Sequence, residues 1–458
     1  MAGTRIASVS GIRGVVGDGF DPSVAGDFAA AYASMLPEGP IVVGHDARVT
    51  APIFEAAVVA SVRATGHDVL LAGPVATPTL GRLVVDRGAA GGVQISASHN
   101  PPRYNGLKFF QPGGMVLGPA DGRAMLDRWE AREIAWAAWD RLGGLEPVFD
   151  PDSRHLDRVL AIVDVEAIRQ ARFVVGLDAC HGAGGRLGAT LLRSLGAEAI
   201  VLGGLPDGRY DHPPEPTEAN LSQFARIIPA LGANVGFAQD PDADRLAIID
   251  ETGRYIGEEL TLALAASHRL SQAIGPVVLN LSTSRTTEDL AGRFGASVVR
   301  TPVGEIHVVE AIRGVSALIG GEGNGGVIDP RVGYVRDSFV AMALILDLMA
   351  QTGESLSSLV AALPRYAMVK DQYPRPVGPG GIPSNPAELF DRIAATYPDA
   401  TTDRRDGLRL DWDDRWVHVR ASNTEPIVRV IAEAVDAATA RALADRLGQV
   451  VADGRGSV

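Results

Sequence analysis

The first candidate reactive residue in this chain is a serine in a turn bounded by prolines. Residues 94–102, Gln-Ile-Ser-Ala-Ser-His-Asn-Pro-Pro, follow an apolar, glycine-rich run, and the two prolines bar a helix through the turn that holds Ser98. We therefore expect Ser98 in an exposed loop at a strand end, where functional serines are common. A serine hydroxyl reacts poorly unless a base, a metal ion or an attached phosphoryl group assists it. These features suggest that Ser98 carries phosphate.

An acidic segment could supply the metal ion. Residues 233–250 have the pattern strand, acidic loop, strand, and the loop contains Asp240, Asp242 and Asp244. Two like charges ~4 Å apart repel by roughly 4 kcal/mol at an effective dielectric constant of ~20. Three crowded carboxylates therefore favour a hard, oxygen-binding cation, and the loop predicts a Mg²⁺ site.

The same spacing also fits a calcium loop of the EF-hand type. The three aspartates fall at its first, third and fifth positions, and Glu251 falls at its twelfth. Its sixth position is Arg245, where the sharp turn needs glycine, and the flanks have a strand pattern rather than a helical one. Calcium is therefore the weaker interpretation.

Two later loops could hold a polar ligand. In residues 316–328 an apolar strand runs into a glycine cluster, which we expect to expose Glu322 and Asn324 to sugar hydroxyls. In residues 417–431 two guanidinium groups and short polar side chains surround one turn, a pattern suited to phosphate. The residues of this phosphate cradle are Arg420, Ser422, Asn423, Thr424 and Arg429.

Six segments, in this order, resemble the α-D-phosphohexomutase family, which includes phosphoglucomutase, phosphomannomutase and phosphoglucosamine mutase. They are Ser-Gly-Ile-Arg-Gly at 10–14, Val-Gly-His-Asp-Ala-Arg at 43–48, Ser-Ala-Ser-His-Asn-Pro at 96–101, Asp-Pro-Asp-Ala-Asp-Arg at 240–245, Gly-Glu-Gly-Asn-Gly at 321–325 and Arg-Ala-Ser-Asn-Thr-Glu-Pro at 420–426. The resemblance covers essentially the whole chain.

The resemblance implies a phosphohexomutase, which moves a phosphoryl group between the 1- and 6-positions of a hexose. Ser98 would be phosphorylated in the resting enzyme, and its phosphate and the three aspartates would bind Mg²⁺. Transfer to the sugar would give a hexose 1,6-bisphosphate, which turns around and returns its other phosphate. Glu322 and Asn324 would grip the sugar while the cradle holds the phosphate that is not reacting.

The resemblance also assigns the remaining catalytic residues. Lys108 would be the acid/base, and Arg13 and Arg245 would lie near the reacting phosphate. Only two lysines occur in the chain, and one of them lies ten residues after Ser98. Lysine, unlike arginine, can release its proton when its surroundings lower its pKa. We expect His99 to orient the loop rather than form a dyad with Ser98, because adjacent side chains usually point apart.

The chain departs from the family pattern in places. Many relatives have a histidine where Gly326 stands, so no proton role is assigned there. Near a loop where some relatives have a functional histidine, the matching place is Glu305, and we interpret His307 as structural. Cys180 is expected to be an ordinary buried thiol.

Composition indicates a cytoplasmic enzyme of several domains. The chain has 458 residues, one cysteine, no apolar N-terminal leader and a net charge of −13, which disfavours nucleic acid as a partner. Residues 339–350 form an apolar helix too short to span a membrane. Cations in the predicted loops, Arg48 among them, would make a positive cleft within an acidic protein. We expect sugar phosphates as partners, no membrane, and a monomer or homodimer.

Strand and helix patterns alternate along most of the chain, as in parallel α/β sheets. Residues 40–44, 67–72 and 173–177 have the pattern of buried strands, and residues 51–65 that of a helix. We predict three α/β domains with mixed sheets and a C-terminal α+β domain around a central cleft. Their expected bounds are 1–152, 153–253, 254–368 and 369–458.

The sequence leaves the sugar open. The glycine-rich loop at 320–326 resembles phosphoglucosamine mutases and broad-specificity mutases of archaeal type, whereas Pro-Glu-Pro at 214–216 is closer to phosphoglucomutase/phosphomannomutase. Glucosamine, glucose and mannose phosphates all remain candidates. A metal-dependent sugar phosphatase and a non-catalytic sugar-phosphate sensor are the alternative functions.

Overall fold

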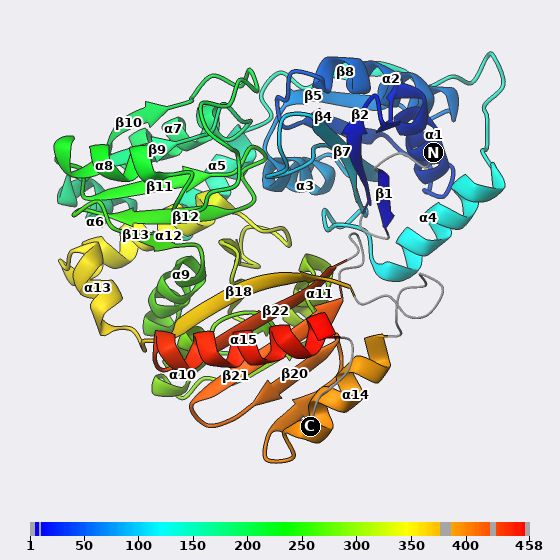
Figure 1. Ribbon diagram of the computed structural model, residues 1–458. Coiled ribbons are helices and arrows are strands. Elements are labelled where there is room, and N and C mark those ends of the chain that lie inside the picture. Colours follow the sequence, from blue (N-terminus) through cyan, green and yellow to red (C-terminus); the bar gives the residue numbers. More distant parts are fainter. Residues whose placement is uncertain (1–4, 9–10, 376–385, 422–426, 454–458) are drawn as a thin grey trace.

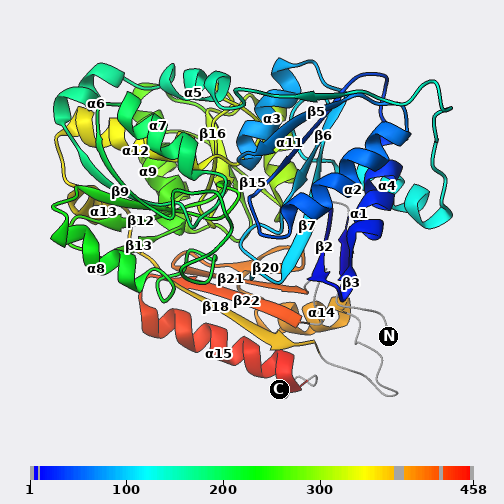
Figure 2. The same ribbon diagram turned by 90° about the horizontal axis from the view of Figure 1, so that it is seen from above.

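The computed structural model describes residues 5–8, 11–375, 386–421 and 427–453. Successive parts of the chain build four sheets. In Figure 1 the first unit (blue) lies at the upper right, the second (green) at the upper left and the fourth (orange to red) below. In Figure 2, viewed from above, the fourth unit (orange to red) lies along the lower edge of the view.

The first unit contains a mixed sheet in the order β1-β2-β7-β6-β4-β5-β8, with β3 beside β2. Its central strands β4 and β6 are buried along their whole length, because helices cover both faces of the sheet. The strands are β1 Arg5–Ser8, β2 Gly11–Val16, β3 Gly19–Phe20, β4 Ile41–His45, β5 Val69–Pro74, β6 Gly91–Ile95, β7 Tyr104–Phe110 and β8 Leu145–Pro147. The helices are α1 Pro22–Ala33, α2 Ala51–Ala64, α3 Thr77–Asp86 and α4 Pro119–Ala131.

The second unit has the strand order β10-β9-β11-β12-β13, in which the first three strands are parallel and the last three antiparallel. The acidic loop lies at the β11–β12 turn. The strands are β9 Val174–Asp178, β10 Glu198–Leu202, β11 Val235–Gln239, β12 Leu246–Asp250 and β13 Tyr255–Gly257. The helices are α5 Ser153–Leu160, α6 Val165–Ala171, α7 Gly185–Ser194 and α8 Ser222–Ala230.

The third unit has the strand order β15-β14-β16-β17 and shares an apolar core with the second. Its apolar helix α12 is buried from Ser338 to Met349 and packs between the two units. The strands are β14 Val277–Asn280, β15 Val298–Thr301, β16 Ile319–Glu322 and β17 Gly326–Ile328. The helices are α9 Glu259–Gln272, α10 Arg285–Arg293, α11 Glu305–Val315, α12 Ser338–Thr352 and α13 Leu356–Ala362.

The fourth unit is an antiparallel sheet, β18-β22-β21-β20-β19, with its own core against two helices. The strands are β18 Ala367–Pro374, β19 Thr401–Asp403, β20 Leu408–Asp411, β21 Arg415–Ala421 and β22 Ile427–Ala434. The helices are α14 Pro386–Thr396 and α15 Ala437–Asp453. The fold class predicted from the sequence is confirmed.

The domain bounds stay a prediction, and β13 extends the second sheet to Gly257, beyond the expected bound at residue 253. In the part of the chain that the structure describes, none of the helices has by itself the length and apolar composition of a membrane span, and only the pair α12 and α13, bent by 90°, has them together.

Candidate active site

Ser98 lies in the turn between β6 and β7 and faces the acidic loop of the second unit. Its Oγ donates a hydrogen bond to Asp240 Oδ2 at 3.0 Å, and its backbone N–H donates to Ser96 Oγ at 2.8 Å. The expectation of an exposed loop is wrong, because Ser98 has no exposed surface. The second unit covers the turn, so Ser98 is enclosed between two units.

His99 contacts Ser98 directly, which corrects the expectation that the two side chains point apart. The distance from Ser98 Oγ to His99 Nδ1 is 3.2 Å. Ser98 has φ of 51°, in the left-handed region, and this turn brings the two neighbouring side chains to the same side. Burial, with Arg245 and Arg13 nearby, holds the pKa of His99 well below its usual range, so the ring is neutral.

Arg48 fixes the serine turn through hydrogen bonds to its backbone. Its guanidinium donates to the carbonyl oxygens of Ser98, Asn100 (2.7 Å), Pro101 (2.9 Å) and Tyr104 (3.0 Å), and it pairs with Asp46 at 2.9 Å. Its side chain is 1% exposed. The expected place for this cation in a positive cleft is therefore wrong, because its donors are used by the backbone of the turn.

Three buried carboxylates lie together in the acidic loop. Asp240, Asp242 and Asp244 each offer an oxygen within 4.8 Å of the others. Oδ1 of Asp242 and Oδ1 of Asp244 are buried without a hydrogen-bond partner. Buried carboxylate oxygens without partners are costly, and oxygen donors are what Mg²⁺ prefers. These residues therefore fit the predicted metal ion.

The pKa values of the three carboxylates shift in different directions, because the groups repel one another and differ in their neighbours. Burial, then Asp242 and Asp244, raise the pKa of Asp240 well above its usual value. Burial also opposes ionisation of Asp242 and Asp244, but neighbouring cations outweigh it and lower both pKa values. Those cations include Lys108, whose Nζ lies 2.5 Å from Asp242 and 2.9 Å from Asp244.

The expectation that the surroundings of Lys108 lower its pKa is therefore wrong. It lies on β7 and is buried, and burial alone lowers the pKa of an ammonium group. The charges of Asp242 and Asp244 outweigh that effect and raise the pKa of Lys108. In this arrangement the ammonium group offsets the negative charge of the acidic loop.

A cleft of about 740 Å³ opens beside the serine turn and is lined by all four units. Its volume falls in the range of small-molecule sites. The lining cations are Arg13, Arg245, Lys370, Arg420 and Arg429. Four carboxylates also line the cleft, those of Glu215, Glu258, Glu259 and Glu322, so the expected positive cleft is one of mixed charge. Four of the five cations stand on strands rather than in loops.

Two arginines lie opposite each other on the wall formed by the fourth unit. Arg420 on β21 pairs in register with Arg429 on β22, and both line the cleft. Like charges at directly opposed positions of a sheet destabilise it. Asp406 offsets part of this charge at 3.5 Å from Arg420 Nε, and a bound phosphate would offset more. Ser422, Asn423 and Thr424, also assigned to this cradle, lie outside the described residues.

The sugar loop is the hairpin of β16 and β17. Glu322 accepts hydrogen bonds from Asn280 (2.7 Å), Arg336 (2.8 Å) and the backbone of Gly304 (3.1 Å). The expectation that glycines expose Glu322 is wrong, because it is 3% exposed, although it and Asn324 line the cleft. Neighbouring cations outweigh burial and lower the pKa of Glu322, so it is a carboxylate that can accept hydroxyl donors.

Sequence comparison decides the family. Family models described as phosphoglucomutase/phosphomannomutase match the chain four times: α/β/α domain I over residues 4–133, domain II over 153–253, domain III over 257–366 and the C-terminal domain over 386–449. The chain belongs to the phosphoglucomutase/phosphomannomutase family. It is a phosphohexomutase, an isomerase that moves phosphate within a sugar.

Relatives of this phosphohexomutase match it along nearly its whole length. It is 36% identical to "Phosphoglucomutase/phosphomannomutase" of Thermococcus kodakarensis, covering 95% of this chain and 96% of that protein. It is 35% identical to "Probable phosphoglucosamine mutase" of Methanopyrus kandleri, covering 96% of each. The crystal structure of a family protein from Burkholderia thailandensis, 24% identical, shares the fold with a TM-score of 0.84 over 97% of this chain and 96% of that one.

Two charged residues near the active site of this phosphohexomutase were not among those predicted from the sequence. Arg336 is buried and joins Asp244 (2.7 Å) to Glu322 (2.8 Å), so it links the acidic loop to the sugar loop. Lys370 lines the cleft and pairs with Glu259 at 2.8 Å. The rarity of lysine in the chain was a usable signal for Lys370, whereas nothing in the spacing of residues 330–337 marks Arg336.

Two other residues lie apart from the site. His307 is on α11, 4.0 Å from Glu310, and does not line the cleft. Cys180 is buried, which raises the pKa of its thiol, and the expectation of an unreactive buried cysteine agrees with this.

Proposed function

We propose that this phosphohexomutase interconverts hexose 1-phosphates and hexose 6-phosphates through phosphoserine at Ser98 and a hexose 1,6-bisphosphate. One observation carries the proposal. Ser98 Oγ lies 3.0 Å from Asp240, in a trio of buried carboxylates, at the edge of a cleft whose other wall bears Arg420 and Arg429. A reacting phosphate and a distant phosphate can therefore be held at the same time.

Each transfer exchanges one phosphorus–oxygen bond for another. A sugar hydroxyl oxygen attacks the phosphorus, and the bond from phosphorus to Ser98 Oγ breaks. The Lys108 ammonium would give a proton to Ser98 Oγ, and the resulting amine would take the proton of the sugar hydroxyl. We assign the acid/base role to Lys108, as the family pattern implies. His99 also contacts Ser98 Oγ, and as a neutral ring it can orient the hydroxyl without adding charge.

The other residues of the cleft would bind the metal ion, the sugar and the two phosphates. Mg²⁺ bound to Asp240, Asp242, Asp244 and the phosphoserine would withdraw charge from the phosphoryl oxygens. Arg13 and Arg245 also line the cleft and would hold those oxygens as hydrogen-bond donors. Glu322 and Asn324 would bind sugar hydroxyls, and Arg420 and Arg429 the distal phosphate. Since one cradle serves both orientations, the bisphosphate can turn around and react at its other end.

Glucose, mannose and glucosamine phosphates are the substrates we propose to compare. The names of the relatives include phosphoglucomutase/phosphomannomutase and phosphoglucosamine mutase, so both classes belong in one assay. We also propose that the enzyme acts in the cytoplasm, as a monomer or homodimer, with hexose 1,6-bisphosphate as its primer.

Intact-protein mass spectrometry tests the phosphoserine. After incubation with glucose 1,6-bisphosphate, the wild type should gain one phosphoryl group, mapped to Ser98, and Ser98→Ala should gain none. Loss of the carrier should lower mutase turnover by at least about 10³-fold. Ser96→Ala, the same deletion two residues away, should still gain the group. Full mutase activity in Ser98→Ala would refute the mechanism.

Removal of metal gives a second test. Dialysis against a chelator should abolish turnover, and added Mg²⁺ should restore it, because the buried trio otherwise lacks a divalent counter-charge.

Arg420→Ala should raise KM and lower turnover if the distal cradle acts as proposed. A phosphatase needs no distal cradle, so unchanged turnover in Arg420→Ala would favour that function instead.

A further inference from the structure

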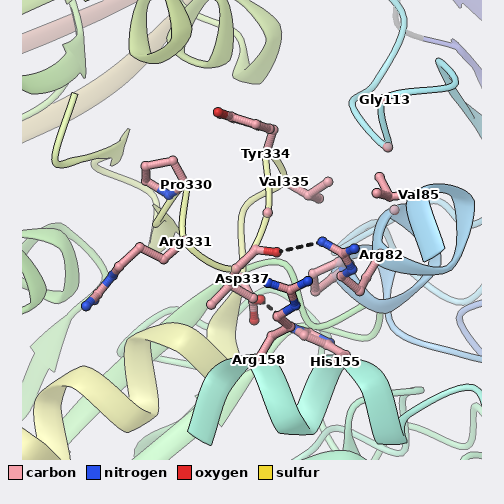
Figure 3. Close-up of a pocket in the computed structure, with 15 residues that line it drawn as sticks. Arg82, Val85, Gly113, His155, Arg158, Pro330, Arg331, Tyr334, Val335 and Asp337 are labelled. Atoms are coloured by element: carbon pink, nitrogen blue, oxygen red, sulfur yellow. Dashed lines mark hydrogen bonds and ion pairs between the residues drawn. The ribbon is translucent and has the colours of Figure 1, made fainter. Parts of the chain in front are cut away.

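A second cavity, of about 220 Å³, lies where three units meet. It is bounded by α3 of the first unit, α5 of the second and the segment 330–337 between β17 and α12 of the third (Figure 3). A single water needs only ~10–15 Å³ measured in this way, so a small organic molecule can enter. The residues that line this cavity differ from those that line the catalytic cleft.

Two arginines from opposite walls give the cavity its charge. Figure 3 shows Arg82 and Arg158 directed into it, whereas Arg331 points away and pairs with Asp329 at 2.6 Å. Arg158 is exposed, and no carboxylate in the described part of the chain lies within 4.0 Å of its guanidinium. Arg82 pairs with Asp86, and its Nη1 donates to the carbonyl oxygen of Val332 at 3.4 Å, but its Nε is buried without a hydrogen-bond partner. Guanidinium donors therefore remain for an anion.

The other polar groups of the cavity do not oppose an anion strongly. Asp337 is the lining carboxylate, and it accepts hydrogen bonds from His155 Nε2 (2.7 Å) and from the backbone N–H groups of Phe339 (2.9 Å) and Val340 (3.2 Å). Its charge is therefore already engaged at the start of α12. Val85 and Val335 supply apolar wall that a carbon skeleton can contact.

The cavity walls also carry contacts of the catalytic site. Thr77, which precedes the lining residue Pro78, donates from its Oγ1 to Asp242 Oδ2 at 2.5 Å and from its backbone to Asp242 O at 2.9 Å. Arg336, between the lining residues Val335 and Asp337, binds Asp244 and Glu322. A ligand that contacts Arg82 on α3 and Val335 in the segment 330–337 would therefore steady both the acidic loop and the sugar loop.

We propose that this cavity binds a small organic anion between Arg82 and Arg158, and that binding activates the enzyme. The anion's oxygens contact both guanidinium groups, and its carbon atoms lie against Val85 and Val335. Binding needs no mutase turnover, whereas the activation rests on the proposed function. The site recognises the oxyanion chemistry that carboxylates and phosphates share, and the two sources are distinguished by experiment.

Calorimetric titration of the full-length protein with malonate, and separately with methylphosphonate, tests the site. At least one probe should bind the wild type, and Arg158→Gln should weaken that binding tenfold or more. Arg420→Gln, which alters only the catalytic cleft, should keep it. Absence of binding by both probes, or equal binding by Arg158→Gln, overturns the proposal. Binding lost in Arg420→Gln instead would place the anion in the cleft and also overturn it.

A second variant and an activity readout complete the test. Val85→Glu, at a position that is 41% exposed and thus tolerant of charge, should also abolish binding by placing a carboxylate beside the arginines. It keeps the test decisive if Arg158→Gln fails to fold. A saturating probe should raise kcat/KM of the wild type about fivefold, the lower end of typical couplings, and leave Arg158→Gln at its basal value. An unchanged kcat/KM in the wild type would overturn the activating role.

Discussion

Single buried arginines connect the parts of this active site. Arg48 joins the serine turn to Asp46, and Arg336 joins the acidic loop to the sugar loop. A planar guanidinium with five donors can bridge two carboxylates at fixed angles, which an ammonium group on a flexible stem does less well. The positions of the reacting groups therefore depend on residues that have no part in the reaction.

Arg336→Gln tests this dependence. The change leaves Asp244 and Glu322 buried with one charged partner fewer, so we expect a loss of about 3–5 kcal/mol in unfolding free energy and a large fall in kcat. Arg336→Lys keeps the charge but cannot span both carboxylates. It should recover most of the stability, measured by urea unfolding, while kcat stays about tenfold or more below wild type.

Arg186→Lys is the matched control, since that arginine is exposed and, among the described residues, forms an ion pair with Asp152 alone. Its kcat and stability should stay close to wild type. Recovery of full kcat in Arg336→Lys would show that charge alone is needed at this position.

At the scale of elements, the sugar hairpin rests on the backbone of the acidic loop. Gly325 has φ of 84°, and a Cβ added there would lie 2.5 Å from the carbonyl oxygen of Leu246, the first residue of β12. The backbone N–H of Leu246 donates to Gly325 O at 3.1 Å. This close backbone packing sets the distance between the proposed sugar-binding residues, Glu322 and Asn324, and the three aspartates of the acidic loop.

Gly325→Ala should therefore push the hairpin away from the acidic loop. We expect kcat/KM to fall by about 10- to 100-fold, because small displacements of positioned groups are costly in catalysis. The added left-handed strain should also cost about 1–3 kcal/mol of stability. Steady-state kinetics and thermal unfolding measure the two effects.

Gly314→Ala provides the control within the same unit. Gly314 lies in α11 with no atom within 4 Å of an added Cβ. Alanine favours helices over glycine by up to about 1 kcal/mol, so this variant should be as active as wild type and slightly more stable. Equal kinetics of the two variants would disprove the spacer role of Gly325.

At the scale of the whole molecule, the fourth unit docks on the third through polar contacts that include His418 and Arg285. His418 on β21 lies 2.9 Å from Ser282 Oγ of the third unit and 2.6 Å from the carbonyl oxygen of Asp406. Arg285 of α10 donates to carbonyl oxygens of the fourth unit at Trp412 (2.8 Å) and Asp413 (2.7 Å). These contacts place the cradle arginines across the cleft from Ser98.

The docking contact predicts a sensitivity to acid. Burial lowers the pKa of His418 to about 4, against about 6.5 for an unperturbed histidine. Between these values the unfolded chain binds the proton and the folded chain does not, so stability falls as the pH drops from about 6.5 to 4, by up to about 3 kcal/mol. Above pH ~6.5 this histidine makes no pH-dependent contribution.

Denaturant unfolding across this pH range checks the effect. His418→Asn, which cannot take up the proton, should show a smaller loss of stability between pH ~6.5 and 4 than the wild type. Identical slopes for the two proteins would rule out His418 as the source.

Much of the fold and site could be predicted from the chain alone. The alternation of apolar strands and helices indicated three α/β units and an α+β unit, because period and length are local properties of the sequence. Short polar loops with rare residue types indicated the chemistry of Ser98, the three aspartates and Lys108. Their roles stay predictions until the experiments above are done.

Prediction from the sequence failed for the burial of site side chains and for the groups that they contact. Ser98 was expected in an exposed loop and is enclosed by another unit, and His99 was expected to turn away and contacts it. Arg48 was counted as a cleft cation and holds backbone instead. Each of these outcomes depends on contacts between segments far apart in the chain or on one left-handed residue.

The sequence by itself determined which chemical groups exist and in which turns they stand, since residue type and local pattern are written in it. Only the tertiary structure decided which side chains of the four units line the cleft, that Arg336 joins the acidic loop to the sugar loop, and that a second cavity lies where three units meet. Distances between side chains and the electrostatic field at a buried site arise from packing of distant segments, and no local pattern encodes that packing.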